Sequence, residues 1–134
     1  MTGAGQPTHV FRVRHRLTQA SEYRTVYRLG ARRSAGPVTL YVLPNHRPEH
    51  RLGLSIGRRV GNAIARNRFK RLLREAFRLE RAALPTDASG AFDIVVTLRP
   101  HRPRPLAEYR TILATLAGKA SADLARREPN DGPR

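Results

Sequence analysis

Cysteine is absent from this 134-residue chain, and so is tryptophan, while methionine occurs once. Without cysteine the protein has no disulfide framework, no thiolate metal site and no cysteine nucleophile. Long apolar runs are missing as well, since no segment approaches the roughly 20 residues of a membrane-spanning helix. The first ten residues also lack the apolar core of a signal peptide. These absences predict a cytoplasmic protein without a membrane segment.

Acidic residues are scarce. Asp and Glu number 10 against 26 Lys and Arg, a formal net charge of +16, and only Lys70 and Lys119 among the cations are lysines. A charge of this size strains a compact chain by self-repulsion unless a polyanion neutralises it. Because 40% of the residues are hydrophobic, the chain can still bury one modest core. The composition therefore favours a single folded domain whose partner is nucleic acid.

The patterning along the chain predicts one domain at 10–126 between two loose tails, 1–9 and 127–134. Hydrophobic periodicity predicts, in order, a helix at 17–29, strands at 37–43 and 51–56, a helix at 62–83, a strand at 92–98 and a helix from 105 or 106 to 126. The order α-β-β-α-β-α, with room for one further short strand, is that of an α+β sandwich with one sheet and three helices. We expect the first two strands to form a hairpin and the apolar third to lie in the interior of the sheet.

Cations concentrate in the segment 58–81. This segment holds nine cations and only two acidic residues, Glu75 and Glu80. Its net charge is therefore 9 − 2 = +7 in 24 residues. A charged run usually marks a solvated helix face, but such a face normally mixes signs for i, i+4 pairing. Arginine dominates here, and its planar fork binds phosphates bidentately and stacks on bases. The run therefore favours contact with RNA or DNA over a merely solvated face.

The start of the predicted helix at 62–83 adds a second feature to this segment. Gly57 and Gly61 allow a sharp turn after the preceding strand, and Asn62 fits the N-cap position. Free backbone N–H groups and the positive end of the helix dipole would then lie beside several arginines, where a phosphate can bind.

Three tyrosines form another candidate site. Tyr23 and Tyr27 share one face of the first helix, and Tyr41 lies on the first strand. Aromatic residues at helical spacing belong more often to the core than to a binding platform, yet a tyrosine hydroxyl needs a partner or water and so suits a half-buried position beside a cleft. If the helix lies over the sheet, the three rings can line one groove in which single-stranded nucleic acid stacks.

A search for catalytic groups finds little. The histidines lack metal-binding spacing, and we expect nearly all of them to face solvent: His9, His15, His46, His50 and His101. The aspartates do not pair into the two-metal site of a nuclease, and Asp93 is expected to cap a strand or to pair with an arginine. Ser55 has no histidine and acid companions. The sequence therefore predicts no catalytic residue and no metal site on the protein.

The segment 55–78 reads SIGRRVGNAIARNRFKRLLREAFR, with Arg-Asn-Arg at 66–68. It closely resembles the signature of the protein subunit of bacterial ribonuclease P, the RNR-motif family. The resemblance covers roughly residues 16–116, because RLTQASEYRTVYRLGARR is similar to the family's first helix and VTLYVLPN, RLGLSIGRR and FDIVVTLRP are similar to its strands. This chain departs from the usual pattern at Phe69, where an aliphatic residue is commoner, and at Arg58 and Arg59, where lysines are common.

The resemblance implies a left-handed β-α-β crossover around the arginine-rich helix, against the general rule. It implies a protein that joins a large catalytic RNA, binds the 5′ leader of precursor tRNA and supports endonucleolytic removal of that leader. The chemistry and the Mg²⁺ would belong to the RNA, with no cofactor on the protein alone. By position, the resemblance implies a leader-binding cleft formed by Tyr23, Tyr27 and Tyr41, and catalytic-RNA binding by Arg58, Arg59, Arg66, Asn67, Arg68, Lys70, Arg71 and Arg74.

Other functions fit the sequence in part. A ribosomal protein could share both the charge and the sandwich. A nucleoid-type DNA binder would need a groove-reading motif or a dimer seam, and a protein-only nuclease would need clustered carboxylates. The sequence shows none of these three features, and it gives no sign of an obligate protein partner.

Overall fold

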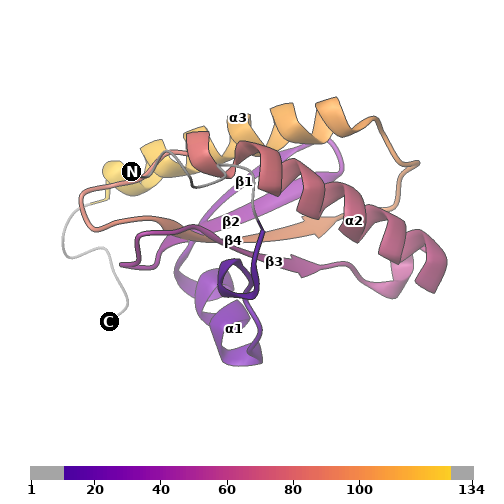
Figure 1. Cartoon of the computed structure of the whole chain (residues 1–134), viewed down its shortest axis with the longest axis horizontal. Helices are drawn as coiled ribbons and strands as arrows, with labels where there is room; N and C mark the ends of the chain where they lie inside the picture. The colour runs from indigo at the N-terminus through magenta and orange to yellow at the C-terminus, as the bar shows by residue number, and fades with distance from the viewer. Residues whose placement is uncertain (1–10, 128–134) are drawn as a thin grey trace, which may run out of the picture.

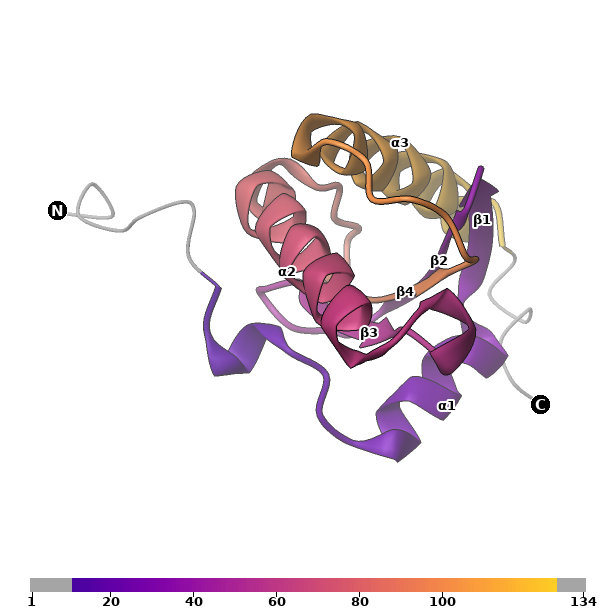
Figure 2. The ribbon, with the colours of Figure 1, turned by 90° about the vertical axis from the view of Figure 1, so that its right-hand side faces the viewer.

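The computed structural model describes residues 11–127, so both predicted tails, apart from Arg127, lie outside the described part of the chain. One sheet has α1 on one face and α2 and α3 on the other (Figures 1 and 2). The elements are α1 (Ala20–Leu29), β1 (Ala31–Ala35), β2 (Val38–Pro44), β3 (Arg51–Ser55), α2 (Ala63–Glu80), β4 (Phe92–Leu98) and α3 (Leu106–Ala125), with short 3-10 turns η2 (Val13–His15), η3 (Arg58–Val60) and η4 (Arg81–Ala83). The predicted α+β sandwich with one mixed sheet and three helices is confirmed.

The strand order in the sheet is β1-β2-β4-β3. β1 pairs antiparallel with β2 and β2 antiparallel with β4, whereas β3 runs parallel to β4. The hairpin predicted between the strands at 37–43 and 51–56 is therefore wrong, because β4 separates β2 from β3. β2 instead forms its hairpin with β1, the strand that the hydrophobic pattern did not reveal. Arg32, Arg33 and Ser34 give β1 no apolar alternation from which it could be predicted.

β4 occupies the interior position predicted from its apolar sequence, and its residues 92–96 are all buried. To run parallel to β3, the chain must first return along the sheet, and α2 makes this return. In Figure 2 both strands run toward the viewer, and the path from β3 through α2 to β4 turns clockwise. A connection that turns clockwise while its strands point toward the viewer is left-handed. It is therefore the left-handed crossover that the family resemblance implies.

The alternation of side chains along the strands divides the core into two parts. The larger part lies between the sheet and the helices α2 and α3 and includes Leu40 and Ile94. The smaller part lies under α1, where Val95 packs against Val26 and Leu17. Because neighbouring residues of β4 face opposite layers, this one strand supports both cores, which explains its continuous apolar run.

α2 begins at the predicted cap. The side chain of Asn62 accepts a hydrogen bond of 2.9 Å from the backbone N–H of Ala65. Gly61 has a φ of +155°, and a Cβ at this position would lie 2.8 Å from the Cβ of Ala65, so only glycine fits. Gly57 has an ordinary φ of −80°. Of the two glycines expected to shape this turn, the geometry therefore requires only Gly61.

Two of the histidines expected to face solvent are buried instead. His15 has no exposed surface and His50 is 4% exposed. The backbone N–H of Arg12 donates to Nδ1 of His15 at 2.9 Å, and the backbone N–H of Phe92 donates to Nδ1 of His50 at 3.0 Å. The prediction fails because the burial of a loop side chain depends on the distant segments that pack over it.

Candidate nucleic-acid interface

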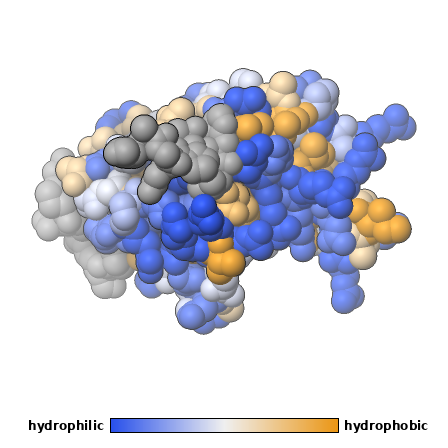
Figure 3. All heavy atoms as spheres, viewed as in Figure 1, coloured by the Kyte–Doolittle hydropathy of each residue, from blue (hydrophilic) through white to orange (hydrophobic). Residues whose placement is uncertain are grey.

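The outer face of α2 presents the cationic residues that the sequence analysis singles out. Exposed on this face are Asn67, Arg68, Arg71 and Arg74, and at its edges, partly buried, lie Arg66 and Lys70. Arg58 and Arg59 are exposed on η3, in the turn that leads into the helix. Figure 3 has the same orientation as Figure 1 and shows a largely hydrophilic surface over α2. We call these eight residues the α2 surface.

Within residues 11–127, the cations of the α2 surface have no carboxylate partners. Asp87 excepted, every carboxylate within residues 11–127 contacts an arginine, and none of those arginines belongs to the α2 surface. Arg81, the last cation of the run at 58–81, turns away from this surface: its side chain is 12% exposed and lies 3.4 Å from Glu49. Unpaired like charges on one surface repel one another, and a polyanion would remove this repulsion.

Arg66, the first residue of the Arg-Asn-Arg triplet, has a side-chain nitrogen without an acceptor in the described residues. Its Nε is buried, and within residues 11–127 it has no hydrogen-bond partner. A buried N–H group without an acceptor costs free energy, more so on a charged group. An oxygen supplied by a bound partner would satisfy it.

A hollow of about 410 Å³ opens beside the α2 surface. Asn67, Arg71 and Arg74 line it together with Arg16 and Phe11 from the segment before α1. The guanidinium of Arg16 lies over the ring of Phe11, 4.9 Å from its centroid. The N-terminal segment thus places a further cation, Arg16, beside the α2 surface. No local pattern in the sequence could have predicted this, since about 50 residues separate the two segments.

Tyr27 and Tyr41, two of the three candidate tyrosines, are in contact. Their rings lie edge to face with centroids 4.8 Å apart, and Tyr27 is 37% exposed. Edge-to-face pairs are a favoured arrangement of aromatic rings. The face of the sheet that carries α1 therefore presents an aromatic corner between the helix and β2.

Tyr23 lies deeper in the same region. Its hydroxyl accepts a hydrogen bond of 3.2 Å from the backbone N–H of Leu54, and its ring lies so close to Gly53 that a Cβ there would be 2.8 Å from it. Burial raises the pKa of Tyr23, so its hydroxyl stays neutral at physiological pH. Tyr23 and Tyr41 both pack against the small core around Val95. The structure brings the three tyrosines together. Tyr23 and Tyr41 are partly buried, and Tyr27 is the most exposed of the three.

A row of hydroxyl side chains crosses the sheet next to these rings. In register across all four strands, on the face that carries α1, lie Ser34, Thr39, Thr97 and Ser55. The hydroxyls of Ser34 and Thr39 are 2.8 Å apart, and none of the four residues is buried. We call these four residues the hydroxyl row. Sequence reasoning missed it, because the row exists only once the strand order and register are known.

The described part of the chain offers few groups for chemistry or for membrane contact. Among residues 11–127, no three His, Cys, Asp or Glu side chains gather as a metal site would require. The predicted pairing of Asp93 is confirmed, since Arg51 binds it through two hydrogen bonds of 2.8 Å. None of the helices in this range combines the length and apolarity needed to cross a bilayer.

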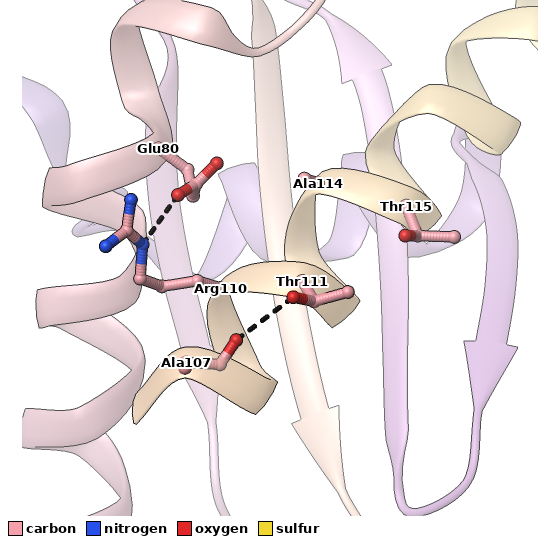
Figure 4. A pocket seen from close by; sticks show the side chains of 6 residues that line it. All are labelled: Glu80, Ala107, Arg110, Thr111, Ala114 and Thr115. Carbon is pink, nitrogen blue, oxygen red and sulfur yellow. Dashed lines mark hydrogen bonds and ion pairs between the residues drawn. The ribbon is translucent and has the colours of Figure 1, made fainter. Parts of the chain in front are cut away.

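A second hollow, of about 360 Å³, lies between α2 and α3 (Figure 4). Arg110 reaches across it to Glu80 at 2.7 Å, and the hydroxyl of Thr111 donates to the backbone carbonyl of Ala107 at 3.1 Å. The polar side chains of Glu80, Arg110 and Thr111 that line this hollow are therefore already engaged within the protein.

The fold and these surfaces define a small α+β protein with a strongly cationic helix on one side of a mixed sheet and an aromatic and hydroxyl surface on the other. Residues 11–121 match the sequence model of the family described as Ribonuclease P. The chain belongs to this family, as a ribonuclease P protein component.

Curated relatives agree with this assignment. The ribonuclease P protein component of Desulfovibrio desulfuricans is 36% identical over 103 residues, which cover 75% of this chain and 76% of the relative. That of Shouchella clausii is 36% identical over 106 residues, 78% of this chain and 84% of the relative. Ribonuclease P and tRNA processing are therefore the context in which the surfaces have to be understood.

Solved structures agree on the fold. The ribonuclease P protein of Thermotoga maritima superposes with a TM-score of 0.68 at 26% identity, covering 78% of this chain and 96% of that protein. The protein from Staphylococcus aureus superposes with a TM-score of 0.64 at 24% identity, covering 84% and 95% of the two chains. The sandwich described here is thus the fold of experimentally determined members of the family.

Proposed function

We propose that this protein binds the catalytic RNA of ribonuclease P through the α2 surface and the 5′ leader of precursor tRNA through the tyrosines on the opposite face of the sheet. In this role it supports endonucleolytic removal of the leader in the cytoplasm. The observation that carries the proposal is the set of cations on α2 and η3 that lack carboxylate partners, while nearly every carboxylate in the described residues is paired elsewhere.

The α2 surface suits a folded RNA. Its arginines come from consecutive turns of one helix and from the turn before it, and the positive end of the helix dipole lies beside Arg58 and Arg59. Each phosphate contact adds a salt-sensitive increment to the affinity. The proposed binding set is Arg58, Arg59, Arg66, Asn67, Arg68, Lys70, Arg71 and Arg74.

The opposite face suits a single strand. Tyr27 and Tyr41 offer ring edges and faces for stacking, and the hydroxyl row beside them can hydrogen-bond to ribose hydroxyls or phosphates. Base stacking on aromatic platforms contributes roughly 1–3 kcal/mol per base. Since only the precursor has a leader, Tyr23, Tyr27 and Tyr41 would favour precursor over mature tRNA.

Catalysis would then belong to the RNA, which would also hold the Mg²⁺. The ion pairs of the protein's carboxylates support this assignment of catalysis to the RNA. Arg51 binds both Glu22 and Asp93, and Arg14 binds Glu49. A carboxylate held by an arginine is a poor candidate for a metal-ligand pair. The protein would contribute binding and positioning rather than a reacting group.

The test is cleavage of a labelled precursor tRNA at low Mg²⁺ by the protein alone, by a bacterial ribonuclease P RNA alone, and by the two together. We expect cleavage at the mature 5′ end only when both are present. Cleavage by the protein alone would place an active site on it. If the folded protein gave a competent RNA no stimulation, a ribosomal or other RNA-binding role would replace this proposal.

A further inference from the structure

We propose that the loop between β4 and α3, residues 99–105, is a second, rigid binding surface for phosphates of the catalytic RNA. The inference rests on the proposed function above and extends its RNA interface beyond α2. The loop reads RPHRPRP, with three arginines separated by prolines and one histidine. We call it the RPHRPRP loop.

His101 fastens this loop to both helices beneath it. Its Nδ1 lies 2.8 Å from the backbone carbonyl of Arg99, and its Nε2 lies 2.7 Å from the hydroxyl of Tyr109 in α3. The ring packs on Phe69 of α2 with centroids 4.8 Å apart. The buried hydroxyl of Tyr109 also accepts the backbone N–H of Arg104 at 3.1 Å. One histidine and one tyrosine thus hold a segment that has no regular structure of its own.

The prolines and these anchors fix the loop before any partner binds. Pro100, Pro103 and Pro105 each restrict the backbone to one φ region, which lowers the entropy lost on binding. Their rings are exposed, so they add nothing to the hydrophobic core. An exposed loop held so firmly is suited to presenting side chains at fixed positions.

Arg99 and Arg102 are the side chains that the loop presents. Both are exposed, and within residues 11–127 neither forms a hydrogen bond or ion pair through its guanidinium. Arg104 lies closer to the protein: it is 3.9 Å from Glu108, and a Cβ on Gly36 would be 3.7 Å from its guanidinium. Arg99 and Arg102 therefore resemble the cations of the α2 surface in having no carboxylate partner in the described part of the chain.

The position of the loop indicates which RNA it meets. β3 and β4 are parallel, with Ser55 opposite Thr97, so the turn carrying Arg58 and Arg59 and the RPHRPRP loop leave the sheet at the same edge. Figure 2 faces this edge and shows both segments turned toward the viewer. His101 packs against α2 itself through Phe69, next in sequence to Arg68. The loop thus continues the α2 surface, while the tyrosines lie across the sheet, and we assign it to the catalytic RNA.

The experiment compares three double variants in binding to ribonuclease P RNA without tRNA, over a series of salt concentrations. Arg99→Ala with Arg102→Ala removes the loop cations. Arg47→Ala with Lys119→Ala removes the same charge from two other exposed residues that form no ion pair within the described range. Arg68→Ala with Arg71→Ala tests the α2 surface. Because all of these side chains are exposed, each variant is expected to fold, which a thermal melt verifies.

We expect the loop variant to weaken RNA binding about tenfold and to lower the slope of log affinity against log salt by about 1–2, as for lost phosphate contacts. The Arg47 and Lys119 variant should stay close to the unmodified protein. If the loop variant behaved like this control while the α2 variant lost affinity, the loop inference alone would fail. If neither the loop variant nor the α2 variant lost affinity for the RNA, both the loop inference and the proposed function would fail.

Two further readouts sharpen the assignment. His101→Ala keeps all three loop arginines but removes their anchor, so affinity should fall by a smaller factor than in the double-arginine variant. An unchanged affinity would overturn the claim that the loop is preorganised. Holoenzymes assembled at saturating protein are then compared in precursor binding with leaders of different lengths. If the loop variant binds RNA normally but loses leader-dependent precursor affinity, the loop faces the precursor tRNA and our assignment is wrong.

Discussion

Arg51 and Asp93 lie directly opposite each other on the parallel strands β3 and β4 and form two hydrogen bonds of 2.8 Å, one from Nε and one from Nη2. The remaining guanidinium nitrogen, Nη1, donates a hydrogen bond of 2.9 Å to Glu22 of α1. Both side chains of the central pair are nearly buried, at 12% and 11% exposure. One arginine therefore joins α1, the helix that carries Tyr23 and Tyr27, to the strands β3 and β4.

Removing this arginine should destabilise the protein strongly. Arg51→Ala leaves Asp93 charged and nearly buried without its partner, a change that typically costs about 3–5 kcal/mol. Urea unfolding followed by circular dichroism measures the loss. Arg104→Ala is the matched control, because it breaks an exposed pair of 3.9 Å and should cost no more than about 0.5 kcal/mol. Equal losses in the two variants would contradict the structural role given to Arg51.

The tyrosines should affect precursor tRNA and leave mature tRNA alone. Tyr27→Ala removes the most open ring and should weaken precursor binding by the holoenzyme by about 1–3 kcal/mol, the contribution of one stacked base. Tyr27→Phe keeps the ring and should bind normally. Unchanged precursor affinity in a Tyr23→Ala and Tyr27→Ala double variant would show that the cleft assignment is wrong, and so would an equal loss for mature tRNA.

The hydroxyl row should distinguish a ribose leader from a deoxyribose leader. Thr39→Val and Thr97→Val keep the shape of each side chain but remove the group that can bond to a 2′-hydroxyl. The unmodified holoenzyme should prefer the RNA leader, and each substitution should reduce that preference about fivefold, the equivalent of one hydrogen bond of about 1 kcal/mol. Precursors that differ only in the sugar of the leader provide the measurement. A preference that survives the Thr39→Val and Thr97→Val double variant would mean that other groups detect the 2′-hydroxyl.

Glu49 should make stability depend on acid pH. Hydrogen bonds from Arg14 at 2.7 Å and His15 at 2.6 Å lower the pKa of Glu49 to about 2 from an ordinary value of 4.5. A carboxylate whose pKa is lower in the folded state stabilises the protein fully above the unfolded value, and the benefit disappears as the pH falls from about 4.5 to about 2.

Glu49→Gln should therefore lower stability by roughly 1–2 kcal/mol at pH 7, since its partners include one exposed arginine. The difference in melting temperature from the unmodified protein should shrink as the pH is lowered below 4.5. Thermal melts at pH 7 and pH 3 test this. The same difference in melting temperature at both pH values would show that the charge of Glu49 contributes nothing to stability. Glu108→Gln serves as the control, because the contact of Glu108 with Arg104 is 3.9 Å long.

Local patterns predicted much of this protein because their causes are local. The apolar face of α2, its Asn62 cap and its cationic outer face follow from side chains within a few positions of one another. The interior position of β4 followed from its unbroken apolar run. Elements whose side chains carry their own periodicity could be predicted, whereas β1, with two arginines and a serine at its centre, could not.

The sequence by itself determined the charge, the helices, three of the strands and the cationic character of α2. Only the tertiary structure decided which of them meet. The pairing of β3 with β4 aligned the hydroxyl row and placed the RPHRPRP loop beside the turn before α2. Packing buried His15 and joined Arg33 to Asp123 across 90 positions of sequence. The physical reason is that strand register, burial and ion pairing are set by residues far apart in the chain, and no local window of sequence contains both partners.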